Sequence, residues 1–183
     1  MKKFAVVSSL LLLIAVVFVG CAAPPPPEPE PTPPPDSMPQ QPALTINAST
    51  DKWAYAIGEE LVVSVRAEQP CYVTIFNVSP DGIVTRIFPN GLASNNYIQG
   101  QQIYHIPNPS DRFRLQVTRQ RGGERLRVIA TLENVNIVAP RLTNESFPVF
   151  NGTPEQFDEA IDQQLATLPA ASWADTKLMF QVQ

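Results

Sequence analysis

Six arginines within 16 residues are the densest group of potential binding side chains in the sequence. They are Arg112, Arg114, Arg119, Arg121, Arg125 and Arg127. A guanidinium group can donate two parallel hydrogen bonds to a carboxylate or a phosphate. The group therefore predicts a contact for an anionic partner, which we expect to be an acidic protein, a glycan or a lipid headgroup. The alternative is a solvated face that resists aggregation, with internal ion pairs such as Arg112–Glu133.

Residue types that could support catalysis are sparse. His105 is the only histidine, and its setting in Ile103–Pro107 predicts a residue on an edge strand. Acyl transfer requires a nucleophile, a base and an orienting group, and zinc requires several His or Cys ligands. Cys71 lies in an apolar strand pattern that predicts a buried thiol. We therefore expect no enzyme, no metal and no cofactor; a hydrolase with an unrecognised site is the less favoured alternative.

The first 20 residues are organised as an export signal. Lys2 and Lys3 precede a short apolar run, and the small residue Gly20 precedes Cys21. This order resembles the lipobox of bacterial lipoproteins. The resemblance implies cleavage before Cys21, and acylation of its sulfur and amine by fatty acids such as palmitate. It also implies a lipid anchor in a membrane of the bacterial cell envelope.

Three neighbours of Cys21 refine this resemblance. Phe18 and Val19 depart from the common pattern, which has Leu at the first position and a smaller residue at the second. Ala22 follows the cysteine, where Asp favours retention in the inner membrane of Gram-negative bacteria. The resemblance therefore implies the outer membrane, if the cell is Gram-negative.

An exporter of eukaryotic type would give the chain a different chemistry. Cys21 would then be an ordinary residue, and four Asn-X-Ser/Thr triplets would be candidates for glycosylation. These triplets begin at Asn47, Asn77, Asn144 and Asn151.

Charge and composition divide the chain into three parts. Removal of residues 1–20 takes away Lys2 and Lys3, which leaves 11 basic residues against 17 acidic ones and a net charge of −6. Such a chain is not suited to bind nucleic acid through its backbone charge. Residues 21–42 hold the lipidated cysteine and a proline-rich tether, which we expect to be extended and semi-rigid. Residues 43–183 are long enough for one domain, and no second apolar run could span a membrane.

Alternating apolar and polar residues predict several strands in this domain. The apolar phase of the first is Leu61, Val63, Val65 and Ala67. Further strands are expected at 71–78, 83–88, 102–106 and 173–182. The sequence 79–82, Ser-Pro-Asp-Gly, predicts a turn between two of them.

Residues 112–133 predict a hairpin. Gly122 and Gly123 suit a two-residue turn, which would place Phe113 opposite Leu132, and likewise pair the apolar residues that follow. One register then gives both strands the same apolar face. The opposite, outer face would carry Arg112, Arg114 and Arg127.

One amphipathic helix interrupts the strands at about 153–168. Thr153 is a candidate N-cap, Pro154 suits the first turn, and Gln156 completes a capping box. The expected apolar stripe is Phe157, Ile161, Leu165 and Leu168. The carboxylates expected on a solvated face are Asp158, Glu159 and Asp162. Together these elements predict a mostly β fold, an antiparallel Ig-like β-sandwich, with the helix inserted to cover an edge or an open end.

Several short motifs resemble those of the bacterial family called domain of unknown function 4384. They are Tyr55-Ala-Ile-Gly-Glu59, Cys71-Tyr72-Val73, Asp81-Gly82, Phe88-Pro89-Asn90, Ile98-Gln-Gly100 and Ile106-Pro107. The likeness covers about residues 50–133, although the family usually has Gly where this chain has Cys71. It implies a β-rich module of exported bacterial proteins and supplies no catalytic residue. We expect a lipid-anchored envelope protein that is a non-catalytic binding or assembly module, or alternatively a structural lipoprotein without a specific partner.

Overall fold

The computed structural model describes residues 43–117 and 121–183. The predicted signal peptide, Cys21, the proline-rich tether and Arg119 lie outside these ranges. The described part is mostly β, with one α-helix, α1 (Pro154–Leu165), and 3-10 turns at Ala139–Arg141 and Ala170–Ser172. Its strands are β1 (Ile46–Thr50), β2 (Ala54–Tyr55), β3 (Glu60–Leu61), β4 (Val63–Ala67), β5 (Cys71–Val78), β6 (Val84–Phe88), β7 (Tyr97–Ile98), β8 (Ile103–Ile106), β9 (Leu115–Gln116), β10 (Gly122–Thr131) and β11 (Trp173–Val182).

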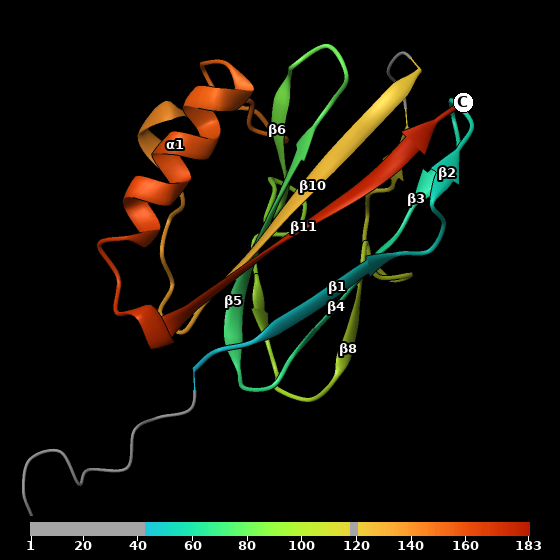
Figure 1. The fold of residues 1–183 in the computed structure, drawn as a ribbon. Helices are drawn as coiled ribbons and strands as arrows, with labels where there is room; N and C mark the ends of the chain where they lie inside the picture. The colour runs from blue at the N-terminus through green and yellow to red at the C-terminus, as the bar shows by residue number, and fades with distance from the viewer. Residues whose placement is uncertain (1–42, 118–120) are drawn as a thin grey trace, which may run out of the picture. The chain divides into compact units, whose positions relative to one another are not determined.

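The strands form three sheets among the described residues. The largest has the order β2-β11-β10-β5-β6, with β7 also paired to β5. A three-stranded sheet has the order β1-β4-β8, and β3 pairs with β9. The pairing is antiparallel, except that β2 runs parallel to β11. Figure 1 shows β10 and β11 as long neighbouring strands, with α1 beside them.

Most of the predicted strands are confirmed. The expected phase of the first strand is correct, because Leu61, Val63, Val65 and Ala67 are all buried, although the chain divides there into β3 and β4. The turn between β5 and β6 is also confirmed. Gly82 has φ of +80°, a conformation that residues with a Cβ rarely adopt, and its N–H donates to the carbonyl of Ser79 at 2.9 Å.

The predicted hairpin at 112–133 is wrong. Gly122 and Gly123 are not a turn; they lie within β10 and pair with Val182 and Gln181 of β11. The other edge of β10 pairs with β5, and β9 pairs with β3. The predicted apolar phase is correct, since Phe113, Leu115 and Val117 are buried. Alternation fixes which face a strand buries, but it does not identify the strand beside it.

Two clusters of buried side chains form the core. The first joins the three-stranded and six-stranded sheets and includes Val63, Val65, Val73, Ile75 and Val128. The second lies between the six-stranded sheet and α1. It consists of Phe76, Val78, Val84, Ile129, Ile137, Val138, Phe150, Phe157, Ile161 and Leu165.

The predicted helix and its N-terminal capping box are confirmed, but the predicted place of the helix in the fold is wrong. The Thr153 hydroxyl accepts a hydrogen bond from the N–H of Gln156, and the Gln156 side chain accepts one from the N–H of Thr153. Phe157, Ile161 and Leu165 are buried, with Leu168 partly buried at the margin. The stripe packs on the face of the six-stranded sheet rather than on an edge or an open end (Figure 1). Strand β10 is consequently buried on both faces.

Candidate functional site

Arg127 lies beneath α1 and not on an outer face. Its side chain is 2% exposed and contacts three carboxylates. Nη1 lies 2.9 Å from Oδ1 of Asp158, and Nη2 lies 2.5 Å from Oδ1 of Asp162. Nη2 also lies 2.6 Å from Oδ2 of Asp175, on β11. The placement predicted for Arg127 is therefore wrong, because the helix covers the face that was expected to be solvated.

Arg125 belongs to the same group of charges. Its Nη1 lies 2.7 Å from Oδ2 of Asp158. We call Arg125, Arg127, Asp158, Asp162 and Asp175 the Arg127 cluster. The predicted solvated helix face is thus wrong for Asp158, whose side chain is 28% exposed, and only partly right for Asp162, which is 65% exposed.

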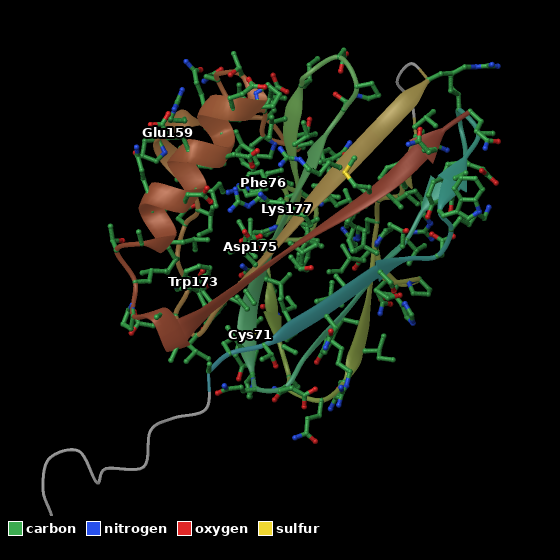
Figure 2. The ribbon with its side chains drawn as sticks, in the orientation of Figure 1. Cys71, Phe76, Glu159, Trp173, Asp175 and Lys177 are labelled. Carbon is green, nitrogen blue, oxygen red and sulfur yellow. The ribbon has the colours of Figure 1, made fainter. Side chains whose placement is uncertain are left out.

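The strand periodicity explains how the cluster assembles. Residues 125 and 127 of β10 pair with residues 179 and 177 of β11, so Arg125, Arg127 and Lys177 share the face beneath the helix. Figure 2 shows Asp175 and Lys177 on β11, with Glu159 on the helix. Burial acts to raise the pKa of Asp158, but the hydrogen bond from Arg125 and the charges of Arg125 and Arg127 outweigh it. The pKa of Asp158 therefore lies below its ordinary value.

Three of the predicted arginines lie at the surface. Arg112, Arg114 and Arg121 are exposed. Arg114 donates to the carbonyls of Asp111 at 3.0 Å and Phe113 at 2.8 Å. The structure therefore divides the predicted set: Arg125 and Arg127 pair with carboxylates of the chain, whereas Arg112, Arg114 and Arg121 are exposed.

A pocket of about 340 Å³ opens where the core between the sheets turns polar. We call it the Asn77–Glu124 pocket. It is lined by Asn77, Thr85, Ile87, Arg114, Leu115, Gln116, Glu124 and Phe147. Its volume lies within the range of small-molecule sites.

Strand register places the polar groups of this pocket together. On β5, the core-facing phase runs through Val73 and Ile75 to Asn77, which pairs with Thr85 of β6. On β10, the same phase runs through Val128 and Leu126 to Glu124. The apolar ladder of each strand therefore ends in a polar side chain at one end of the sheet. Gln116 of β9, Arg114 and Phe147 complete the walls.

The Asn77 and Glu124 side chains are joined by a hydrogen bond. Glu124 is 3% exposed, and Nδ2 of Asn77 donates to its Oε2 at 2.7 Å. Oδ1 of Asn77 is buried and has no hydrogen-bond partner in the described part of the chain. Buried polar atoms are nearly always paired, so an unpaired acceptor in the wall of a pocket is a candidate contact for a ligand.

His105 and Ser64 form a second polar pair. The Nδ1 atom of His105 lies 3.0 Å from the Ser64 hydroxyl. The placement of His105 on an edge strand is confirmed, since β8 pairs only with β4 among the described strands. Asp111 lines the same shallow 190 Å³ hollow as His105, but its Oδ2 accepts from the N–H of Asn108. In residues 43–117 and 121–183 no carboxylate orients the His105 ring.

The prediction of a buried thiol is confirmed for Cys71. It is fully buried and forms no disulfide, and burial raises its pKa to about 11. The described residues contain no group of three or more His, Cys, Asp or Glu side chains that could hold a metal ion. None of the helices described is long and apolar enough to cross a membrane.

Sequence reasoning missed Asn77, Glu124 and Ser64. The signal for the first two was nevertheless present. Both occupy positions where the alternation of an otherwise apolar strand calls for a core side chain, and such exceptions often mark functional sites. Ser64 carried no signal, because a serine on the exposed phase of a strand is ordinary.

Comparison with known proteins gives one match. No curated protein and no solved structure matches this chain. The predicted resemblance is supported for the centre of the described domain, which includes β2 to β10 and the whole lining of the pocket except Phe147. Residues 54–134 match the family described as Domain of unknown function (DUF4384).

Proposed function

We propose that this chain is a lipid-anchored protein of the bacterial cell envelope whose described domain is a non-catalytic binding module. The export signal, Cys21 and the proline-rich segment support the anchor and the tether. The pocket supports the binding role. For the fold we propose an Ig-like sandwich, which is supported by the core cluster shared between the two larger sheets.

The Asn77–Glu124 pocket is the observation that carries the binding role. It combines a carboxylate that is 3% exposed with a buried, unpaired amide oxygen. Burial of polar groups costs free energy unless they are hydrogen-bonded. A domain without a ligand would be expected to fill these core-phase positions with apolar side chains.

The exposed arginines support a second contact of the same module. Arg112 and Arg121 extend into solvent, and Arg114 stands in the wall of the pocket. We propose that they contact an anionic surface of the partner, which would be an acidic protein, a glycan or a lipid headgroup. A structural lipoprotein without a specific partner is the alternative, and a hydrolase is less favoured.

Crosslinking in native envelopes tests the proposal. Three forms of the chain would be compared: the unmodified sequence; Gln116→Trp, which fills the pocket from an exposed position of β9; and Gln163→Trp, a matched change on the outer side of α1. We expect the unmodified protein and Gln163→Trp to yield the same crosslinked molecule, and we expect Gln116→Trp not to yield it. Identical recovery from all three would contradict a binding role for the pocket.

Two further measurements separate the parts of the proposal. Arg112→Glu/Arg121→Glu should weaken crosslinking, whereas Arg66→Glu/Lys52→Glu, an equal charge reversal at two surface ion pairs, should not. Equal recovery from both variants would dismiss the arginine contact. The intact mass of the natively expressed protein tests the anchor, because an unmodified Cys21 thiol would exclude it.

A further inference from the structure

We propose that the Asn77–Glu124 pocket binds a neutral saccharide unit, through its hydroxyl groups and one apolar face of its ring. This inference rests on the proposed binding function and names the ligand class of the same pocket.

The charges of the lining indicate a neutral ligand. Arg114 and Glu124 are the charged side chains among the described residues that line the pocket. The Arg114 guanidinium already lies near a carboxylate of the chain, with 3.9 Å between its Nε and Oε2 of Glu60, so it does not offer an unbalanced charge to an anion. Glu124 is also engaged already, since it accepts a hydrogen bond from Asn77 at 2.7 Å.

The hydrogen-bonding groups indicate hydroxyls. Oδ1 of Asn77 is an acceptor without a donor in the described part of the chain, so a hydroxyl of a ligand that reaches it would supply the missing hydrogen bond while Nδ2 keeps its bond to Glu124. Thr85 and Gln116 each carry both a donor and an acceptor. A sugar hydroxyl can also donate and accept, so it can satisfy each of these groups in either sense.

The apolar part of the lining suits a sugar ring. Ile87, Leu115 and Phe147 stand in the same walls as the polar groups. The Phe147 ring meets the Phe113 ring edge to face, with centroids 5.8 Å apart, a preferred aromatic geometry that fixes its orientation. One face of a pyranose ring consists of C–H groups, which pack well on such a surface, while its hydroxyls reach outward.

The carboxylate count indicates binding without cleavage. Glycosidases commonly use two carboxylates that flank the scissile bond. In the described part of the chain, Glu124 is the one carboxylate that lines this pocket. A saccharide held there would therefore lack the second group that hydrolysis requires.

Titration of the full-length protein with simple sugars tests this inference. The protein would be held in a detergent without a sugar headgroup, and binding followed by saturation-transfer NMR and calorimetry. The neutral probes are glucose, galactose, mannose and N-acetylglucosamine. Glucosamine and glucuronate add an ammonium and a carboxylate to the same ring.

We expect at least one neutral sugar to bind, and its charged analogues to bind no better. Gln116→Trp should weaken this binding by at least about tenfold, and Gln163→Trp should leave it unchanged. Asn77→Leu, which keeps the volume and removes the acceptor, should also weaken it, with circular dichroism as the check on folding.

Three results would overturn the assignment of a neutral saccharide. They are no binding of any neutral sugar, binding by Gln116→Trp equal to that of the unmodified protein, and a preference for glucosamine or glucuronate. If one of these three results were obtained while crosslinking in envelopes still depended on Gln116, the saccharide assignment would be wrong and the binding function would stand. If no neutral sugar bound and crosslinking did not depend on Gln116, both the saccharide assignment and the binding function would be overturned.

Discussion

The Nη2 atom of Arg127 lies 2.6 Å from Oδ2 of Asp175, which joins β10 to β11 beneath α1. Asp158 and Asp162 approach the same guanidinium from the helix. Hydrogen bonds between charged groups are about twice as strong as neutral ones. The Arg127 cluster therefore holds the helix to the sheet at the margin of the apolar stripe.

Removal of the Arg127 guanidinium should destabilise the domain strongly. Arg127→Ala would leave Asp158, Asp162 and Asp175 without their shared partner, and loss of one member of a buried ion pair costs about 3–5 kcal/mol. The urea midpoint should fall accordingly. Asp162→Asn is the matched control, because this carboxylate is 65% exposed and exposed pairs contribute about 0–1 kcal/mol. Equal losses from the two variants would contradict this account.

The cluster should also give the domain a specific sensitivity to acid. The pKa of Asp158 in the folded state lies below the ordinary 3.8. Its stabilising effect is therefore complete above the pKa of the unfolded chain and disappears as the pH falls through the folded pKa. We expect the stability difference between the protein and Asp158→Asn, measured by urea unfolding, to shrink below about pH 4. A difference independent of pH would show that the charge of Asp158 is not the cause.

The packing of α1 gives a third prediction. Phe157 is fully buried, and its ring centroid lies 4.9 Å from that of Phe76. Phe157→Ala should cost about 3–5 kcal/mol, and Thr153→Ala, which removes the N-cap, about 1 kcal/mol. Leu168→Ala, at the partly buried margin, should cost less than Phe157→Ala. Thermal or urea unfolding checks this order, and a reversed order would contradict the observed packing.

The reactivity of the two cysteines tests both the burial of Cys71 and the proposed lipidation of Cys21. Burial raises the pKa of Cys71 to about 11, and only thiolates react readily with disulfide reagents. At pH 8 we expect no thiol of the native, lipidated protein to react, and Cys71 alone to react after unfolding. A second thiol that reacts in the native state, and persists in Cys71→Ser, would be Cys21 without lipid. Reaction of Cys71 in the native state would contradict its burial.

Local features of the fold could be predicted from the sequence because local chemistry determines them. The capping box at Thr153, the apolar stripe from Phe157 and the turn at Gly82 each depend on residues within a few positions of one another. The buried face of β4 could be predicted in the same way, because the alternation of apolar and polar residues indicates which side chains are buried.

The partners of β10 could not be predicted, because they depend on contacts between distant segments. Gly122 and Gly123 suit a tight turn, yet β10 pairs with β5 and β11. The same error explains why Arg127 was predicted on an outer face. A strand that is covered on both faces can carry a charged residue such as Arg127 only where carboxylates from other segments contact it. The candidate pocket was hidden for a similar reason, since Asn77 and Glu124 are 47 positions apart in the sequence.

The hydrogen bond from Leu44 to the carbonyl of Ala171 fixes where the preceding chain joins this domain. That point adjoins Trp173, which pairs with Thr131 at one end of β10. Glu124 lies seven residues along the same strand, a distance of about 23 Å at the rise of a β-strand. Residue 43 and the Asn77–Glu124 pocket thus lie toward opposite ends of β10, so a chain segment that precedes residue 43 joins the domain far from the opening of the pocket.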